Sequence, residues 1–256
     1  MIARALVAVL LLALAVGRAQ AIDHKNLDAG RPVRVEDAYA IADGEFALEA
    51  AGGFTLERKG SDRGVFPVEA LYGAYPNLQL AIGTTLSTSP REIDGRPRSG
   101  DVQLGALYNL NQETLVVPAL ALRLGLETPT GEGSQGVGVE VKGIVTKSIQ
   151  RLAVHLNAGY QFLTGTRRDE RDGVYRLALG ASYPLGAPWL TRLLLVGDVF
   201  AEQAARRSEP PIVGTELGLR YQLTPRLVWD VGVGTEFAGS RRRSDLFMTT
   251  GVSVGF

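Results

Sequence analysis

The final segment of the chain, residues 246 to 256, alternates apolar residues with small or polar ones and ends on an aromatic residue. Its apolar face would carry Leu246, Met248, Val252, Val254 and Phe256. Its other face would carry Thr249, Gly251, Ser253 and Gly255. The wall of a barrel needs this two-residue period, because successive side chains of a strand point to opposite faces. The segment is typical of the closing strand of a bacterial outer-membrane β-barrel, and we expect the barrel-assembly machinery to engage it through Phe256.

The opposite end of the chain has the features of an export signal. Arg4 precedes an uncharged apolar run from residue 5 to residue 16, and Ala19-Gln20-Ala21 supplies a cleavage site before Ile22. The run is well short of the roughly 20 residues that a helix needs to cross a bilayer. We therefore expect residues 1–21 to be a secretory signal peptide and not an anchor in the inner membrane.

The charge balance and the lack of cysteine limit the partners of the mature chain. The 27 basic residues less Arg4 and Arg18 leave 25 against 27 acidic residues, a net charge of about −2. This balance gives no strong positive field that would attract nucleic acid. A chain without cysteine has neither disulfides nor thiolate metal sites. We expect no metal, no cofactor and no nucleic-acid partner.

From Phe46 onward the chain divides into about twelve alternating segments. We place them near residues 46–58, 64–75, 77–87, 100–110, 115–128, 136–148, 151–164, 173–183, 191–204, 212–223, 226–238 and 245–256. Short connections at 75–77, 149–151 and 224–226 alternate with longer polar ones at 88–99, 129–135, 165–172, 205–211 and 239–244. The pattern predicts a single all-β domain over residues 46–256. We expect an antiparallel transmembrane β-barrel of the bacterial outer-membrane type, with short periplasmic turns and longer outer loops.

Alternation alone does not tell which face points inward, because a soluble barrel around an apolar ligand also alternates. The predicted segments are long, since strands of soluble proteins most often have about 5 to 6 residues, and soluble closed barrels mostly stop near eight strands. Aromatic residues on the apolar face also gather near both ends of the segments, as interfacial girdles do. Toward the periplasm they are Phe46, Tyr72, Tyr108, Tyr183, Tyr221, Trp229 and Phe256, and toward the outside Phe54, Phe66, Phe162, Tyr175 and Phe237. These features favour lipid outside, in the bacterial outer membrane.

The opposite face carries the charged residues, which are the candidates for lining the lumen. They are Arg123, Glu127, Glu140, Lys142, His155, Arg176, Arg192, Asp198, Glu202, Glu216, Arg220, Asp230 and Glu236. On a lipid face each Arg or Lys would cost roughly 2 to 4 kcal/mol at the midplane. With Glu49, Glu57, Glu69 and Asp101 included, 11 acids stand against 5 Arg and Lys residues, so an open lumen should favour cations. Alternatively, the charges pair across the interior and hold a narrow barrel shut, because buried charges need partners.

Residues 22–45 precede the predicted barrel and carry mixed charge with little alternation. This segment either hangs in the periplasm or folds into the lumen as a plug, and the sequence favours neither. A twelve-strand wall lies between eight-strand barrels with filled interiors and sixteen-strand porins with an aqueous channel. The position of residues 22–45 therefore decides how wide the pore is.

The stretch from Arg31 to Glu49 (RPVRVEDAYAIADGEFALE) resembles the opening of the outer-membrane proteins grouped as the meta-pathway of phenol degradation family. Those proteins typically begin with an Arg-Pro-Leu-like step, an acidic pair before Ala, a Gly about six residues later and then a first strand. Here Val33 stands where Leu is usual, and Glu36-Asp37 stands where a Thr or Asp pair is common. The resemblance implies an outer-membrane barrel that acts as a transporter, with aromatic or other hydrophobic compounds among its solutes.

Some outer-membrane barrels are enzymes, so the two histidines need an explanation. His24 follows the cleavage site, and we expect it to be a solvated tail residue. His155 lies on the lumen face, whereas a barrel hydrolase needs His and Ser at the lipid-facing rim with an acid or amide behind them. Nor does the glycine-rich stretch 131–138 have the Lys-Ser/Thr pair of a phosphate-binding loop. We therefore expect no catalytic residue.

The longer connections are rich in arginine, at positions Arg91, Arg96, Arg98, Arg167, Arg168, Arg171, Arg206, Arg207, Arg241, Arg242 and Arg243. Guanidinium groups suit anionic solutes or the phosphates of lipopolysaccharide. Equally, these are solvated loop tips balanced by acids such as Asp169 and Glu170. Pro67 and Pro118 fall inside predicted strands and predict bulges there.

These features predict a channel or transporter for passive passage of small molecules across the outer membrane, in contact with its lipid and lipopolysaccharide. The alternative is a closed structural or adhesin-like barrel that acts through its arginine-rich outer loops. Deleting residues 165–172 would separate the two, because an adhesin should lose surface binding whereas a pore should keep conducting.

Overall fold

The computed structural model describes residues 23–28, 30–58, 62–88, 98–132, 134, 136–186, 192–239 and 244–256. The predicted signal peptide, residues 1–21, lies outside this part of the chain. So do Gly133 and several of the loop arginines named above, which are Arg91, Arg96, Arg241, Arg242 and Arg243.

The described chain forms β-strands joined by turns and loops. The strands are β1 (Phe46–Glu57), β2 (Arg63–Tyr75), β3 (Leu78–Thr88), β4 (Arg98–Ser99), β5 (Val102–Asn111), β6 (Ala119–Thr128), β7 (Gly138–Ile149), β8 (Leu152–Leu163), β9 (Gly173–Leu185), β10 (Leu193–Glu202), β11 (Ile212–Thr224), β12 (Leu227–Ala238) and β13 (Ser244–Gly255). Neighbouring strands are antiparallel, and β1 pairs with both β2 and β13. Since β2 also pairs with β3, the sheet closes on itself.

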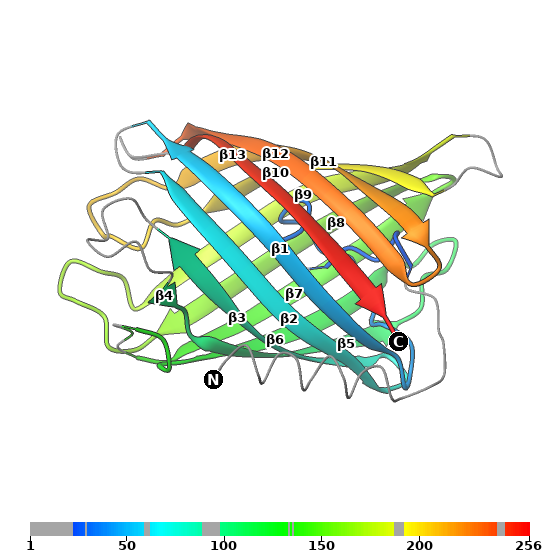
Figure 1. The fold of residues 1–256 in the computed structure, drawn as a ribbon, viewed down its shortest axis with the longest axis horizontal. Helices are drawn as coiled ribbons and strands as arrows, with labels where there is room; N and C mark the ends of the chain where they lie inside the picture. Colours follow the sequence, from blue (N-terminus) through cyan, green and yellow to red (C-terminus); the bar gives the residue numbers. More distant parts are fainter. Residues whose placement is uncertain are drawn as a thin grey trace.

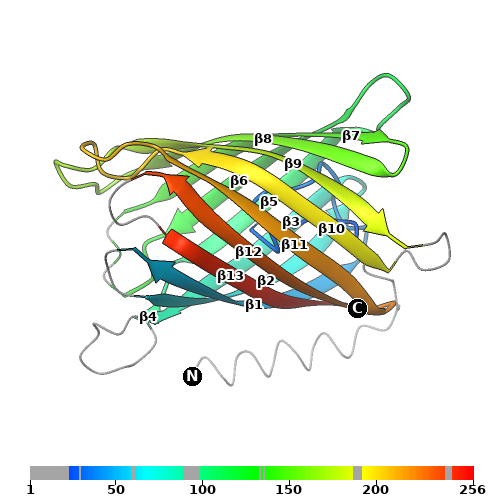
Figure 2. The ribbon, with the colours of Figure 1, turned by 90° about the horizontal axis from the view of Figure 1, so that it is seen from above.

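The predicted antiparallel barrel of about twelve strands is confirmed. Among the described residues, twelve long strands form the wall, and the two-residue β4 only extends the pairing of β3 near its outer end. The strands run obliquely around a central space (Figures 1 and 2). No helix in the described part of the chain is long and apolar enough to span a bilayer.

Both ends of the barrel sequence meet at one end of the molecule. Ala47 of β1 lies opposite Gly255 of β13, and the Phe256 N–H donates to the Phe46 carbonyl at 2.8 Å. Tight turns join β2 to β3, β7 to β8 and β11 to β12 at this end, which we call the periplasmic end. The longer loops gather at the opposite, outer end (Figure 1).

The wall differs from the sequence prediction at the two internal prolines. The predicted strand 115–128 begins only at Ala119, because residues 112–118 form a loop that ends at Pro118. The predicted bulge at Pro67 is wrong, because this residue stays within β2 in unbroken register and pairs with Thr85 of β3. On the β1 side of β2, Pro67 and Phe66 have no paired residue, and residues 51 and 52 of β1 are left out of the ladder. This is expected because proline has no N–H to donate.

The outer face of the wall is apolar and the inner face is mostly polar. Exposed apolar side chains follow the predicted phase on all sides of the barrel, for example Ile82, Leu104, Leu124, Leu156, Leu179, Val199, Leu217 and Val233. The girdle aromatics Phe54, Phe66, Tyr72, Tyr108, Phe162, Trp229 and Phe237 are also exposed. Soluble proteins rarely expose continuous apolar surface on this scale. The chain is therefore a barrel of the bacterial outer-membrane type.

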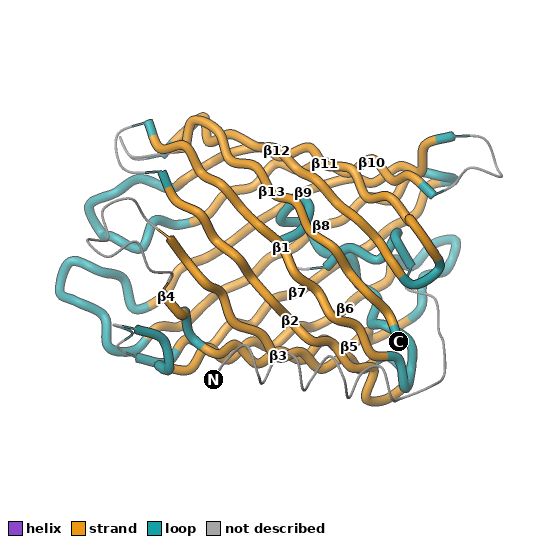
Figure 3. Tube along the Cα trace, in the orientation of Figure 1, coloured by secondary structure: helices purple, strands orange, loops and turns teal. Residues whose placement is uncertain are grey.

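Residues 23–45, of which residue 29 is not described, lie inside the barrel, and we call them the internal segment. Figure 3 shows this segment as a loop within the ring of strands, and its dark blue trace in Figures 1 and 2 runs behind the wall. Its N–H groups and side chains contact inward-facing residues from both sides of the barrel, as described next.

Candidate functional site: the barrel lumen

The internal segment crosses the lumen as an irregular chain with several turns and bends, and side chains of the wall bind its backbone N–H groups. The acceptors come from separate strands, and the donor to acceptor distances lie between 2.5 and 3.0 Å: Arg34 to Glu216, Val35 to Asp198, Glu36 to Asn157, Ala38 to Thr146, and Ile41 to Gln79. Backbone groups buried away from water need such partners. The polar inner face therefore serves the internal segment as well as any solute.

Wall side chains also bind backbone carbonyls of the internal segment. Asn109 Nδ2 donates to the Ala38 carbonyl at 2.7 Å, and Thr249 Oγ1 donates to the Pro32 carbonyl at 3.0 Å. Asn157 Nδ2 donates to the Glu36 carbonyl at 2.9 Å, while its Oδ1 accepts from the N–H of the same residue. Asn157 thus binds Glu36 much as a neighbouring strand would.

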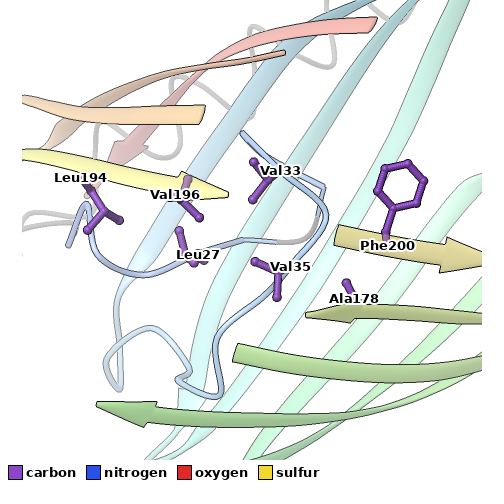
Figure 4. Packing of buried hydrophobic residues seen from close by; sticks show 7 residues of the cluster. All are labelled: Leu27, Val33, Val35, Ala178, Leu194, Val196 and Phe200. Carbon is purple, nitrogen blue, oxygen red and sulfur yellow. The ribbon is translucent and has the colours of Figure 1, made fainter. Parts of the chain in front are cut away.

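The buried apolar residues of the protein lie mainly between the internal segment and the inner wall. Leu27, Val33 and Val35 pack against β9 and β10, as Figure 4 shows, with Ala178, Leu194, Val196 and Phe200 on the wall. Ala38 packs on the other side against Leu107, Ala119, Ala121 and Ile144. Ile41 packs near the periplasmic end against Ala47, Leu71 and Val228. The internal segment is therefore fixed by apolar contacts as well as by hydrogen bonds.

A row of alternating charges runs across the lumen on the outer side of the internal segment. Each acid lies next to a base, with nitrogen to oxygen distances from 2.9 to 4.0 Å. The row begins at β11, ends at β2 and passes twice through the internal segment. In order it contains Glu216, Arg34, Glu202, Arg176, Glu140, Lys142, Glu36, Arg123 and Glu69. We call this row the charge belt.

Glu36 lies within the charge belt and is almost completely buried. Burial opposes its ionisation, but the positive charges of Arg123 and Lys142 outweigh that effect and lower its pKa. Its Oε1 lies 3.3 Å from the Arg123 guanidinium and 3.0 Å from Lys142 Nζ. One carboxylate of the internal segment thus balances two cations of the wall.

A second ionic cluster lies deeper in the barrel. Arg31 pairs with Glu49 and with Asp230, and Arg220 pairs with Asp28 at 3.1 Å. Burial, together with the nearby charge of Glu49, raises the pKa of Asp28 to about 7 despite Arg220. The cluster again joins residues of the internal segment to inward residues of β1, β11 and β12.

The charges of the internal segment complement those of the wall that each one faces. Strands β10 to β12 and β1 direct six acids and one base into the lumen. The acids are Glu49, Asp198, Glu202, Glu216, Asp230 and Glu236, and the base is Arg220. The internal segment places Arg31 and Arg34 against these acids. Strands β6 to β9 present Arg123, Lys142 and Arg176, and there the internal segment places Glu36. Without the internal segment, the side of the barrel formed by β10 to β12 and β1 would keep a surplus of acids. We call this side the acidic wall.

Cavities lie on both sides of the internal segment. Toward the outer end, one of about 390 Å³ is lined by the charge belt and by Gln103, and one of about 690 Å³ lies beside Phe247 and Glu236. Toward the periplasmic end, a cavity of about 590 Å³ is lined by Asp37, Tyr39 and residues of β7 to β9.

Two aromatic rings and an arginine form part of the wall of the outer cavities. The Arg34 guanidinium lies 3.7 Å from the centre of the Phe200 ring and 5.7 Å from that of Phe247. The rings lie against Gly214 and Gly234, where a Cβ atom would overlap them. Small residues at these positions therefore let both rings lie close to the wall.

The structure brings most of the candidate lumen residues together. The charge belt contains Arg123, Glu140, Lys142, Arg176, Glu202 and Glu216, and Glu127 joins it through Gln161. Asp198, Arg220 and Asp230 bind the internal segment as described above, and Glu236 accepts from the Ser244 N–H at 2.7 Å. Arg192 differs, since it lies exposed in the turn before β10.

Sequence analysis did not assign a role to the uncharged residues that bind the internal segment, which are Gln79, Asn109, Thr146 and Asn157. Their inward position was evident from the strand phase. A further signal was present in the sequence: the same phase carries apolar residues such as Leu107, Ile144 and Val196, which a water-filled lumen would not require. Together they indicate that the middle of the lumen holds polypeptide.

The two histidines are both buried. His155 lies between Thr146 and Ser182, with its ring nitrogens 3.1 and 3.0 Å from their hydroxyl oxygens. The expectation that His24 is a solvated tail residue is wrong, because this residue folds into the barrel with the internal segment and is only 5% exposed. Among the described residues, no group of three or more His, Asp or Glu side chains is arranged to hold a metal ion.

The two arginine-rich loops after β8 and β10 bind each other. Glu170 and Arg206 form an isolated β-bridge, and the Arg207 N–H donates to the Asp169 carbonyl at 2.8 Å. Arg207 also pairs with Asp172 at 3.2 Å, and Arg171 donates to carbonyls of the opposite loop. Much of this arginine content therefore joins one loop to the other.

Comparison with known proteins agrees with this architecture. The sequence matches a family model described as "Putative MetA-pathway of phenol degradation" over residues 29–254. No curated protein matches it significantly.

Several solved structures share the fold at low sequence identity. The COG4313 outer membrane channel from Pseudomonas putida F1 is 15% identical, with a TM-score of 0.65 over 90% of this chain and 100% of that one. The NanC porin is 14% identical, with a TM-score of 0.62 over 81% of this chain and 98% of that one. The KdgM porin is 13% identical, with a TM-score of 0.55 over 82% of this chain and 99% of that one. At these identities the likeness is one of fold.

Proposed function

The chain belongs to the family described as "Putative MetA-pathway of phenol degradation", and on that premise we propose that it is an outer-membrane channel for the passive passage of small molecules. The lumen is the path, and the internal segment is a plug that narrows it. The observation that carries the proposal is the position of the internal segment between cavities that lie toward both ends of a closed barrel.

A plug of this kind can move, because the described bonds that hold it are hydrogen bonds, ion pairs and apolar contacts. A typical hydrogen bond contributes about 0.5 to 1.5 kcal/mol to stability. The acceptors sit on separate strands, so the internal segment can leave one of them without disturbing the backbone ladder of the wall. Partial release would widen the path while the barrel stays closed.

Selectivity in this proposal comes from the charged residues of the inner face. Arg123, Lys142, Arg176 and Arg220 act against Glu127, Glu140, Asp198, Glu202, Glu216, Asp230 and Glu236, with Arg192 at the periplasmic rim. In the plugged form the charge belt pairs most of these groups, which favours uncharged solutes. Once the internal segment withdraws Arg31 and Arg34, the acidic wall favours cations.

The aromatic part of the outer cavities supports aromatic or other hydrophobic compounds among the solutes. Phe200 and Phe247 offer apolar surface, and Arg34 beside them offers a donor for a polar substituent. Aromatic pairs add about 0.5 to 1.5 kcal/mol beyond the burial of their area. His155 has no catalytic role in this proposal, and no cofactor is needed.

The remaining partners follow from the location of the barrel. The apolar outer face meets membrane lipid, and the C-terminal strand that ends at Phe256 is the element for the barrel-assembly machinery. The exposed Arg167 and Arg168 are the groups available to lipopolysaccharide phosphates.

A reversible tether tests whether the internal segment closes the path. The chain has no cysteine, and Ala38 contacts Thr146 of β7 through a bond of 3.0 Å from its N–H to Oγ1. A disulfide between Ala38→Cys and Thr146→Cys would therefore tether the internal segment to β7. The oxidised double variant should neither conduct in planar bilayers nor admit small sugars into liposomes, and reduction should restore both. Equal conductance in both redox states would reject the plug. Silence of the untethered protein in both assays would favour a closed structural or adhesin-like barrel instead.

A further inference from the structure

The loop between β5 and β6 presents apolar side chains to solvent at the periplasmic end of the barrel. Leu115 is 98% exposed and Val116 is 86% exposed, and Val117 follows them. We call residues 115–117 the apolar tip. Exposure of several adjacent large apolar residues on a soluble surface is unusual and marks a contact site.

The apolar tip is held in a defined shape by the residues before it. The Thr114 N–H donates to the Val117 carbonyl at 2.9 Å, and Thr114 Oγ1 accepts from the Val116 and Val117 N–H groups. Asn111 Nδ2 donates to the Pro118 carbonyl at 2.8 Å and closes the base of the loop. The apolar side chains are therefore presented outward by a turn in which Thr114 binds three backbone groups of Val116 and Val117.

The charged residue of the loop, Glu113, is bound by residues of β7 and of the internal segment. Glu113 accepts from Lys147 Nζ at 2.8 Å and from the Ser148 N–H at 2.7 Å, both on β7. The Tyr39 hydroxyl of the internal segment donates to the same carboxylate at 3.2 Å. Residues 115–117 thus carry no charge of their own, and Lys147 Nζ also donates to the Thr114 carbonyl at 2.6 Å at the base of the apolar tip.

The apolar tip continues the lipid-facing surface of the two strands that carry it. Leu110 and Tyr108 on β5 and Leu120 on β6 are exposed on the outward face and lead to the loop. Figure 2 shows the connection between β5 and β6 leaning away from the barrel at the end where the C-terminus lies. Both observations place the apolar tip toward the membrane that surrounds the barrel.

We propose that the apolar tip inserts into the periplasmic leaflet of the outer membrane and anchors the β5–β6 loop in lipid. Apolar side chains at the headgroup boundary are stabilised by transfer out of water. The anchored loop holds Glu113 in position. Glu113 in turn holds Tyr39 of the internal segment through the bond from the Tyr39 hydroxyl. The proposal concerns the outer surface of the barrel and does not depend on whether the lumen conducts.

A single fluorescent label tests the lipid contact, because the chain has no competing cysteine. Val116→Cys is labelled with a nitrobenzoxadiazole dye, and Arg226→Cys at the β11–β12 turn gives the matched exposed control. Both proteins are refolded into phosphatidylcholine vesicles, with closure of the barrel checked by its heat-modifiable migration. Quenching is then measured with a doxyl-labelled lipid and with aqueous iodide.

The label at position 116 should show blue-shifted emission, lose most of it to the doxyl lipid and resist iodide. The label at position 226 should behave in the opposite way. Equal iodide quenching at both positions would overturn the proposal. Protection from both quenchers that grows with protein density would also overturn it, since the contact would then be a second protein. Leu115→Cys repeats the test if the first variant does not fold.

Discussion

Asn157 of β8 binds both backbone polar groups of Glu36, accepting from its N–H at 2.7 Å and donating to its carbonyl at 2.9 Å. A single side chain thereby gives a residue in the lumen the two bonds that a neighbouring strand would give it in a sheet. Glu36 is also the residue whose carboxylate balances Arg123 and Lys142. The backbone and the side chain of one residue thus join the internal segment to three strands.

Replacing Asn157 with Leu should loosen the internal segment and leave the barrel intact. The change leaves two buried backbone groups without partners, at about 1 to 3 kcal/mol each. Single-channel recordings should show more frequent or longer openings than those of the intact protein. Gln103→Leu is the matched control, because Gln103 lines the outer cavity and bonds no described residue of the internal segment. Equal opening in both variants would contradict the role given to Asn157.

Glu36→Gln should open the path and change its ion preference. The variant leaves Arg123 and Lys142 without their shared carboxylate, and breaking a buried pair in this way costs about 3 to 5 kcal/mol. The reversal potential in a KCl gradient should shift toward anions relative to the intact protein. Glu132→Gln, in the loop between β6 and β7, should leave it unchanged. A reversal potential that stays the same in Glu36→Gln would mean that solutes do not pass these cations.

Reversing the charge at Asp198 or Glu216 should lower the preference of the channel for cations. Both carboxylates belong to the acidic wall and bind N–H groups of the internal segment. Asp198→Lys and Glu216→Lys are therefore expected to increase conductance and to move the reversal potential toward anions. Reversal potentials equal to that of the intact protein would remove these residues from the permeation path.

The open probability should increase as the pH rises from about 4 to about 8. Burial is the main cause that raises the pKa of Asp28 from 3.8 to about 7 and that of Asp37 from 3.8 to about 8. After release of the internal segment both groups return to water and to their ordinary pKa. The protein with the internal segment bound in the lumen therefore carries more protons within this pH range than the protein with the segment released. Binding of the segment in the lumen weakens with rising pH until both groups are ionised.

Single-channel recordings at constant ionic strength check this pH dependence. Asp28→Asn should make the profile less steep between about 4 and about 7, where Asp28 and Asp37 both contribute. The change at higher pH, which comes from Asp37, should remain. An open probability that falls between pH 5 and pH 8 would have the wrong sign for this linkage.

The strand pattern could be predicted from the sequence because lipid and lumen impose opposite demands on alternate residues. The segment from Leu246 to Phe256 shows this directly, and β13 ends one residue before its predicted end. The pattern fails at residues 115–118, where Leu115, Val116 and Val117 are apolar as in a strand but lie in a loop. Hydrophobicity alone does not distinguish a wall strand from an exposed apolar turn.

The internal segment could not be placed from the sequence, because it lacks a period of its own. An inward residue such as Asn157 or Thr146 has the same phase whether it meets water or polypeptide. Its partner is set by the closure of the barrel, which brings the acceptors on β3, β7, β8, β10 and β11 around residues 34–41. This arrangement depends on three-dimensional register and not on any local motif.

Single-channel conductance of the mature protein with and without residues 23–45 is the most direct test of the central claim. The protein without this segment should give larger and steadier steps, with a preference for cations from the exposed acidic wall. Its heat-modifiable migration establishes that the barrel has formed. Identical steps from both proteins would contradict the claim that the internal segment closes the path.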